Sequence, residues 1–406
     1  MVAKVLSLKV YKKLFGILFF SLLVTLPATV AGAAPVTPQE IVADGATGVQ
    51  FQYSDAATAR YITAGAADTQ GKPIKGQSHF RAGSVTKTII STALLQLAEQ
   101  NKVDLNQTID RYLPGVYDFG KTVTITQLLA QTSGLRTGAY ETQFPYNPDT
   151  ILTLKGTQKY LRTYRDPRDI TRYINTTGLN AQPGTLWQYS NANYFIASQI
   201  ISAVTHQPYQ HYIEKHIFTP LGMRETSLPI AQLPLPQPFT RGYQPSEFYS
   251  GQPGGESIDL TKQSPSMFTG SGNVISTTGD LSTFFKNLSQ GKLLNEHSLS
   301  LMHTADVANP IQYGLGIMQF TTPCGMVRGH SGNVYGYATE VYSLGSATVA
   351  ISITEGSSLY ASHSEKSMRL ALEALCPALV NQPIDALKLL DTNEGRHTLF
   401  MPFLRS

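Results

Sequence analysis

A long apolar segment with a single charge constrains this chain most. Between Ser84 and Ala98 the only charged residue is Lys87. Its apolar residues would occupy several faces of a helix: Val85, Ile89, Ile90, Ala93, Leu94, Leu95, Leu97 and Ala98. A helix that is apolar on several faces is a buried one, so the segment predicts a helix at the centre of a domain.

Ser84 and Lys87 open this segment and are three residues apart, so they share a helical face and their side chains can meet. A lysine buried without an acid nearby in the sequence is costly, and burial favours its neutral amine. A neutral amine can take a proton from a neighbouring hydroxyl. The pair alone has simpler explanations, namely a snorkelling lysine and a serine that caps the helix.

Residues 1–33 are typical of a secretory signal. A basic start with four lysines precedes the apolar run Leu14–Leu26, and Ala31-Gly32-Ala33 offers a cleavage site. An uncleaved anchor is the alternative, but the apolar run is shorter than the ~20 residues that span a bilayer. We therefore expect an exported protein, periplasmic or extracellular, that keeps no membrane anchor after cleavage.

The charge balance and the cysteines limit the partners. Four of the 31 Lys and Arg residues lie in the expected signal, so the rest balances the 27 Asp and Glu residues. A net charge near zero implies no attraction to nucleic acid or anionic membranes. The two cysteines, Cys324 and Cys376, most simply form a disulfide in an exported protein, with two free thiols as the alternative.

Strand and helix patterns along the chain indicate the fold class. We expect strands at 49–53, 60–64, 327–330, 337–343 and 348–354, and helices at 125–131, 192–205, 209–218, 280–288 and 365–375. The segment 138–183 is expected to be loop-rich, and four prolines between Leu228 and Pro238 predict a stiff connector. The predicted fold is α/β (α+β), with a mixed, mainly antiparallel sheet flanked by helices. Both termini complete the sheet, and a mostly helical lobe is inserted between them.

Two further strings accompany Ser84 and Lys87. Tyr189-Ser190-Asn191 precedes the 192–205 helix, and His330-Ser331-Gly332 enters a pair of strands. Each string is weak alone, because Asn191 could cap the helix, Tyr189 could be a core aromatic and His330 could lie in a surface turn. Their order and separations are informative together.

With all three strings in view, the chain resembles the serine β-lactamase and penicillin-binding protein family. The matching branch carries S-x-x-K, then Y-x-N, then K-T-G or H-x-G, and a related set with S-D-N in second place is known. This branch contains class C β-lactamases, D-alanyl-D-alanine carboxypeptidases and related esterases, and the chain looks closest to secreted carboxypeptidases with His-x-Gly. Supporting strings lie at 80–84, 128–135, 183–184, 220–223 and 313–316.

The resemblance covers about 42–377 and implies a domain organisation. A hydrolase domain would span 34–377, after a signal peptide over 1–33 and before a C-terminal tail over 378–406. Its α/β lobe would comprise about 42–115 and 265–377, and its helical lobe about 116–264.

The resemblance also implies a role for each motif residue. Ser84 would be the nucleophile that forms an acyl-enzyme, Lys87 would keep its hydroxyl activated, and Tyr189 would be the general base. Asn191 would hydrogen-bond the substrate amide and orient Lys87. The main-chain N–H groups of Ser84 and Asn333 would form an oxyanion hole. The leaving-group side would be faced by His330, Ser331 and Gly332.

Two departures from the family pattern bear on the substrate. His330 replaces a lysine, and an imidazole with an ordinary pKa of about 6.5 is mostly neutral at pH 7, so carboxylate recognition should be weaker or improve on acidification. Carboxypeptidases of this type also carry an arginine on the preceding strand, where 317–322 contains Met318 and no basic residue. Arg328, on the same strand face as His330, is our candidate for the missing charge. A solvated strand-end arginine is the alternative.

The predicted function is that of an exported serine hydrolase, most of all a D-alanyl-D-alanine carboxypeptidase-like peptidase or penicillin-binding enzyme. Its partners would be a small molecule or peptidoglycan peptide, and β-lactams. The alternatives are a β-lactamase or carboxylesterase of the same family, and a non-catalytic penicillin-binding sensor. No metal or cofactor is required, because serine, lysine and tyrosine supply nucleophile and base and the histidines lack a ligand spacing.

Overall fold

The structure is a computed structural model that describes residues 35–136, 154–231, 234–245, 257–304, 312–354 and 360–380. The chain divides into the units Met1–Ala33 and Ala34–Ser406, and every element named below lies in the second unit. The expected signal peptide lies outside the described residues. So does most of the expected tail, from residue 381 onward.

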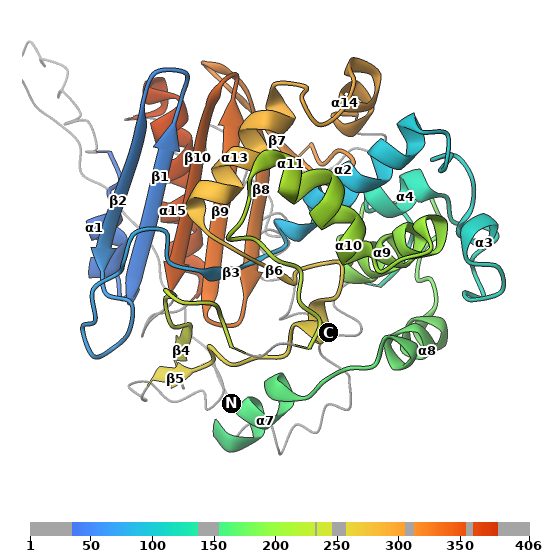
Figure 1. The fold of residues 1–406 in the computed structure, drawn as a ribbon, viewed down its shortest axis with the longest axis horizontal. Coiled ribbons are helices and arrows are strands. Elements are labelled where there is room, and N and C mark those ends of the chain that lie inside the picture. The colour runs from blue at the N-terminus through green and yellow to red at the C-terminus, as the bar shows by residue number, and fades with distance from the viewer. Residues whose placement is uncertain are drawn as a thin grey trace, which may run out of the picture. The chain divides into compact units, whose positions relative to one another are not determined.

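A six-stranded sheet in the order β2-β1-β10-β9-β8-β7 forms one layer of the fold (Figure 1). Every pairing within it is antiparallel. The strands are β1 (Gly48–Ser54), β2 (Ala59–Gly65), β7 (Met318–Thr322), β8 (Gly325–Val334), β9 (Tyr337–Leu344) and β10 (Ala347–Thr354). Two strands come from the N-terminal part and four from the C-terminal part, which confirms a mainly antiparallel sheet completed by both ends of the chain.

Helices cover both faces of this sheet. On β10, alternate residues point to opposite faces, so Val349, Ile351 and Ile353 join one apolar cluster and Ala350 joins the other. The first cluster includes residues of α1 (Pro38–Ala43) and α15 (Tyr360–Leu375), and the second includes residues of α13 (Thr278–Ser289). Figure 1 shows α13 on one side of the strands and α1 and α15 on the other. The central strands β9 and β10 are accordingly buried along almost their whole length.

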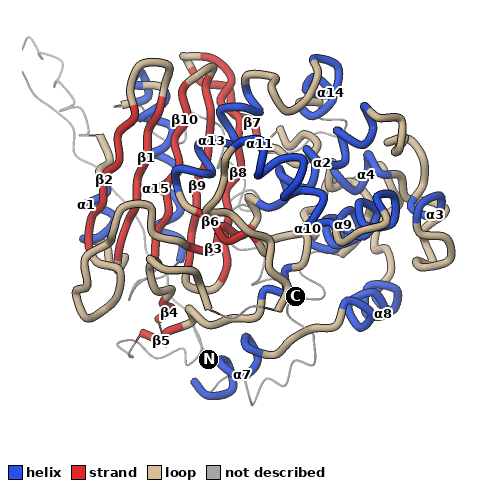
Figure 2. The backbone as a smooth tube through the Cα atoms, viewed as in Figure 1, coloured by secondary structure: helices blue, strands red, loops and turns tan. Residues whose placement is uncertain are grey.

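The segment between β3 (Phe80–Gly83) and β6 (Val274–Ser276), which pair as a small separate sheet, is mostly helical (Figure 2). It contains α2 (Thr86–Glu99), α3 (Ile109–Tyr112), α4 (Ile125–Leu129), α7 (Leu154–Arg162), α8 (Pro167–Thr177), α9 (Asn191–Thr205), α10 (Tyr209–Ile213), a π turn (Glu214–Phe218), α11 (Thr219–Leu221), β4 (Tyr243–Pro245), β5 (Ser257–Asp259) and a 3-10 turn (Pro265–Phe268). The inserted helical part is therefore confirmed. Helix α14 (Glu296–Met302) follows α13, and a 3-10 turn (Pro377–Leu379) follows α15.

The expectation of a loop-rich segment over 138–183 is wrong where α7 and α8 form. Helix α8 begins conventionally, because the Asp166 side chain accepts from the Arg168 N–H and Pro167 is its first residue. Its buried residues Ile170 and Ile174 are four apart, so one apolar face packs inward. Between Leu228 and Pro238 the described residues form no helix or strand, as the prolines predicted.

Helix α2 is buried at the centre, which confirms the prediction from its composition. Every residue from Thr86 to Leu95 is buried, and the Lys87 side chain is 0% exposed. The helix packs against α9, α10, α14 and β8. It therefore places its N-terminus where the helices meet strand β8.

Candidate active site

Ser84 lies in the turn that joins β3 to α2. The turn is held locally, because Thr86 Oγ1 donates to the Gly83 carbonyl at 2.7 Å and the Lys87 N–H donates to the Ser84 carbonyl at 2.9 Å. Gly83 has φ +55°, a left-handed conformation that favours glycine. Ser84 is partly exposed while its neighbours on both sides are buried, so Ser84 is the point of this turn that solvent reaches.

The Lys87 ammonium connects three segments of the chain. Its Nζ donates to Ser84 Oγ at 2.9 Å, to Asn191 Oδ1 at 2.5 Å and to the Ser271 carbonyl at 2.8 Å. Asn191 Oδ1 and the Ser271 carbonyl can only accept, whereas the Ser84 hydroxyl can donate or accept. The geometry therefore fits an ammonium that donates to all three oxygens, and equally a neutral amine that accepts from Ser84, the form expected from the sequence.

Tyr189 and Asn191 lie at the start of α9. Lys87 Nζ is 4.8 Å from the centre of the Tyr189 ring, within the range of a cation–π contact. The capping explanation for Asn191 is wrong, because Ser190 is the N-cap and Asn191 is the first helical residue. Its side chain is thereby available to Lys87. The structure brings Ser84, Lys87, Tyr189 and Asn191 together as the sequence predicted.

Gln131 holds the start of α9 in place, and this role was not predicted from the sequence. It is fully buried with φ +63°, and its Oε1 accepts from the Ser190 N–H at 2.9 Å and from Asn193 Nδ2 at 2.5 Å. The Gln188 N–H also donates to its carbonyl. No pattern in the sequence marks a glutamine for such a role.

Strand β8 lies directly against the Ser84 turn. A Cβ on Gly332 would be 1.9 Å from the Ala82 carbonyl oxygen and 3.1 Å from the Ser84 nitrogen. A Cβ on Gly83 would be 2.8 Å from the Asn333 nitrogen. The main chains at Ser84 and Asn333 are therefore neighbours, which two glycines permit. Two N–H groups so close are the arrangement that an oxyanion needs.

His330 is 0% exposed and both its ring nitrogens are engaged. Nδ1 is 2.5 Å from the Ser331 carbonyl oxygen, which can only accept, so Nδ1 carries the proton. Nε2 therefore accepts from the Tyr313 hydroxyl at 3.0 Å. Burial, and next the charge of Lys87, lower the pKa of His330 to about 3. The expectation that acidification would charge this residue does not hold above pH 5.

From the sequence, Tyr313 was noted only as part of the segment 313–316, which supports the family resemblance, and no role was predicted for it. It is buried, its ring meets the Tyr189 ring edge-on at 6.2 Å between centroids, and it also contacts Trp187. Ser271 was missed as well, since its contribution is a main-chain carbonyl. The glycines on both sides of Ser271 were the signal, because glycine often marks a close approach of the backbone.

Arg328 and His330 occupy the same face of β8, as strand alternation predicted. Arg328 is partly buried, burial lowers its pKa, and its Nε donates to Gln319 Oε1 at 3.0 Å. Gln319 in turn donates to the carbonyls of His303 and Gln312. A role for Arg328 on substrate stays a prediction.

Ser331 faces the other way from His330 and contacts Met318. Its Oγ lies 3.7 Å from Met318 Sδ, and both residues are buried. Met318 pairs with Gly329 and lies diagonally beside Ser331, on the strand where a carboxypeptidase would be expected to carry an arginine. Towards β7, the Ser331 hydroxyl therefore faces the thioether of Met318 and not a positive charge.

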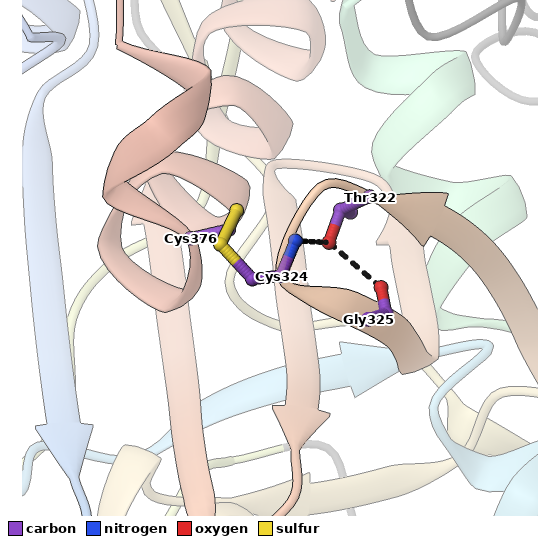
Figure 3. The surroundings of a disulfide bond; sticks show 4 residues. All are labelled: Thr322, Cys324, Gly325 and Cys376. Carbon is purple, nitrogen blue, oxygen red and sulfur yellow. Dashed lines mark hydrogen bonds between the residues drawn. A yellow bond between two sulfur atoms is a disulfide. The ribbon is translucent and has the colours of Figure 1, made fainter.

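The disulfide between Cys324 and Cys376 is present (Figure 3). It joins the turn between β7 and β8 to the residue that follows α15. In the same turn the Cys324 N–H donates to Thr322 Oγ1, and Thr322 Oγ1 donates to the Gly325 carbonyl. The start of β8 is therefore tied to α15 across one face of the sheet.

Two kinds of feature are absent from the described part of the chain. No helix there is long and apolar enough to cross a bilayer. No cluster of three or more His, Cys, Asp or Glu side chains suited to a metal ion occurs there either.

A family model described as Beta-lactamase matches residues 38–364. Among curated proteins of Bacillus subtilis (strain 168), PbpX, named as a penicillin-binding protein, is 30% identical over 237 residues, which are 58% of this chain and 52% of PbpX. Penicillin-binding protein 4* is 28% identical over 282 residues, 67% of this chain and 59% of its own length. The chain thus spans about half the length of the curated relatives that it matches.

Solved structures of similar fold include a D-stereospecific amidohydrolase from Streptomyces sp. The TM-score is 0.73 at 28% identity, over 84% of this chain and 97% of that one. A D-amino acid amidase from Ochrobactrum anthropi SV3, complexed with L-phenylalanine, gives a TM-score of 0.71 at 23% identity, with the same coverage. At that identity the second likeness supports the fold and nothing further.

Proposed function

The chain belongs to the beta-lactamase family, and from that premise we propose that it is a serine hydrolase that cleaves amide bonds through an acyl-enzyme on Ser84. One observation carries the proposal. Lys87 Nζ joins Ser84 Oγ to Asn191 Oδ1 beneath the Tyr189 ring, beside a pair of adjacent main-chain N–H groups. Nucleophile, candidate base and oxyanion donors thus share one small volume.

The proposed reaction uses these groups in turn. Tyr189 takes the proton of Ser84 while Oγ attacks the substrate carbonyl carbon, and the Lys87 ammonium stabilises negative charge on the Tyr189 oxygen. The N–H groups of Ser84 and Asn333 hold the oxyanion. Tyr189 then protonates the leaving nitrogen, the C–N bond breaks, and water later hydrolyses the ester on Ser84.

For the substrate class, we favour D-amino-acid peptides and amides. The chain is 28% identical to a solved D-stereospecific amidohydrolase over nearly the whole of that chain, and its relatives include proteins named as penicillin-binding. Strict D-alanyl-D-alanine carboxypeptidase activity is the finer version of the proposal, and Met318 beside Ser331 argues against it. A β-lactamase or a carboxylesterase with the same acyl-enzyme is the second candidate.

Intact-mass spectrometry with benzylpenicillin tests the acyl-enzyme. We expect an adduct, or hydrolysed penicillin, with the parent protein and neither with Ser84→Ala. Ser289→Ala, a serine on α13 away from the site, is the matched control and should behave as the parent. A panel of an N-acetyl-D-alanyl-D-alanine peptide, D-phenylalaninamide, nitrocefin and p-nitrophenyl butyrate then ranks the substrates. No Ser84-dependent reaction with any of these compounds would overturn the proposal.

We also propose that the protein is exported and that the signal peptide is cleaved between Ala33 and Ala34. The mature chain would then consist of a hydrolase domain over 34–377 and a tail over 378–406. The disulfide between Cys324 and Cys376 supports an oxidising compartment. N-terminal sequencing of the mature protein tests the cleavage. A protein that begins at Met1 in the secreted fraction contradicts it.

A further inference from the structure

A chain of buried polar side chains runs behind the leaving-group side of the candidate site. On β8 and β9, Ser331 pairs directly with Glu340 and Gly329 pairs with Tyr342, so Ser331, Glu340 and Tyr342 share one face of the sheet. All three are buried, and Glu340 is 2% exposed. Burying a carboxyl group costs free energy. The proposed function gives Glu340 no role that would account for this cost.

The contacts form a continuous path. Ser367 Oγ on α15 lies 3.4 Å from Glu340 Oε1, and Glu340 Oε2 lies 2.7 Å from the Tyr342 hydroxyl. Ser331 lies beside the Tyr342 hydroxyl, on the same face of the sheet and diagonally across the strands, and opposes the rise in the pKa of Tyr342. Ser331 Oγ reaches Met318 Sδ at 3.7 Å. The path therefore begins at α15 and ends at Met318, on the strand where an arginine was expected.

Counting protons along this path gives two arrangements. If Glu340 is ionised, Tyr342 must donate to it, and Ser331 then donates to the Tyr342 oxygen and offers a ligand only lone pairs. If Glu340 is protonated, it can donate to the Tyr342 oxygen, and Tyr342 can donate to Ser331. The Ser331 proton is then available to a ligand. The contact with Met318 matches the second arrangement, because a thioether only accepts.

The surroundings of Glu340 favour its protonated form near neutral pH. Burial raises the pKa of Glu340 to about 8, against the opposing hydrogen bonds from Tyr342 and Ser367. Neither of those groups is charged at pH 7. Strand β10 places Ile351 opposite Glu340. On α15, Lys366 pairs with Asp44, Arg369 pairs with Glu373, and Glu365 is exposed.

We propose that Glu340, acting through Tyr342, decides whether Ser331 donates or accepts a hydrogen bond, and thereby sets the specificity for the leaving group. With Glu340 protonated, the site takes a leaving group that ends in an acceptor such as a carboxylate. With Glu340 ionised, it takes one that ends in a donor such as an ammonium. The inference rests on the proposed function and on the family resemblance, which implies that Ser331 lies on the leaving-group side. In these terms Glu340 is a positioning residue.

Two substrates that share the same acyl group and differ in the leaving group test this inference. N-acetyl-D-alanyl-D-alanine releases a carboxylate-bearing amine, and N-acetyl-D-alanine 2-aminoethylamide releases an ammonium-bearing one. We expect the ratio of their kcat/KM values to fall about tenfold between pH 7 and 9, with a midpoint near 8, because the Ser331 donor is lost. The ratio cancels any pH effect on Ser84, Lys87 and Tyr189.

Glu340→Gln should hold the ratio constant at its low-pH value, because the amide donates permanently to the Tyr342 oxygen. Tyr342→Phe breaks the path and should also make the ratio independent of pH. Glu365→Gln, an exposed acid on the same helix as Ser367, is the matched control and should keep the parent profile. A parent ratio that is flat across this range, or a Glu340→Gln profile that keeps the inflection, overturns the inference. The parent profile decides even if the variants do not fold.

The outcomes also separate this inference from the proposed function. If penicillin or an ester acylates Ser84 while neither D-alanyl substrate reacts, the acyl-enzyme stands and the assignment of Ser331 and Glu340 is overturned. If nothing acylates Ser84, the proposed function itself fails.

Discussion

Gly332 lies so close to Ala82 that a Cβ at position 332 would be 1.9 Å from the Ala82 carbonyl oxygen. Real Cβ atoms do not approach a backbone oxygen so closely, so only glycine lets β8 pack on β3 here. This approach is what makes the Ser84 and Asn333 nitrogens neighbours. The spacing of the proposed oxyanion hole therefore depends on a missing side chain.

Gly332→Ala should lower the rate of Ser84 acylation by at least about 100-fold, because the strand must move away and an oxyanion donor is lost. Stopped-flow acylation by nitrocefin measures it. Gly76→Ala is the control, since a Cβ there meets nothing within 4 Å, and it should leave the rate unchanged. Equal rates in the two variants would contradict the proposed hole.

Asn191→Ala should slow acylation by about 10- to 100-fold, because Lys87 loses an acceptor at 2.5 Å and with it a fixed orientation. The same stopped-flow measurement applies. Asn295→Ala removes the cap of α14, whose side chain accepts from the Ser298 N–H. It should cost about 1 kcal/mol of stability and leave acylation intact. A parent-like rate in Asn191→Ala would show that Asn191 does not orient Lys87.

Tyr313→Phe should destabilise the protein by about 1–2 kcal/mol, because the buried Nε2 of His330 loses its only protein donor among the described residues. Acylation should slow as well, since the ring of His330 then lacks a fixed orientation. Tyr53→Phe, at a partly exposed residue near the end of β1, is the control for loss of a hydroxyl. NMR of the histidine rings should show His330 neutral from pH 8 to pH 5 in the parent. Titration of the His330 signal near pH 6.5 would refute this.

The pH dependence of stability should carry the signature of Glu340. Its pKa is about 8 in the folded protein and near 4.5 when exposed, so the folded state binds the proton more tightly between these values. Stability is therefore full below pH 4.5 and declines as pH rises to 8. His330, with its pKa lowered to about 3, contributes the opposite slope below pH 6.5.

Between pH 6.5 and 8 the parent should lose about 1.5 kcal/mol of stability relative to Glu340→Gln in urea unfolding, a difference in which the remaining titration of His330 cancels. Glu340→Gln should show little change over this range, while Glu365→Gln should follow the parent. A parent curve without this decline would mean that Glu340 is not protonated in the folded state.

Removal of the disulfide by Cys324→Ser with Cys376→Ser should lower stability by about 4 kcal/mol at most, given a sequence separation of 52 residues. A reducing agent should lower the Tm of the parent and have no effect on the double variant. Identical melting of the parent with and without reductant would show that the bond contributes little.

Much of the fold was readable from local patterns. Helix α2 followed from an apolar segment with one charge, and the hairpin of β9 and β10 followed from two apolar runs around Gly345. The helices α7 and α8 were missed, because the polar and aromatic residues around them concealed a short apolar face. The sheet order was beyond local patterns, since β1 pairs with β10 across almost 300 residues.

The sequence by itself determined the proposed chemistry at Ser84: the motif strings carry the proposed nucleophile, its lysine, the tyrosine and the asparagine, and these residues lie together in the fold. Only the tertiary structure decided the charge states around them. His330 is neutral and Glu340 holds a proton because distant segments remove both from water, and desolvation depends on everything that packs around a group. The close approach of Gly332 to Ala82 was likewise decided in three dimensions, where two strands share a space that no side chain could occupy.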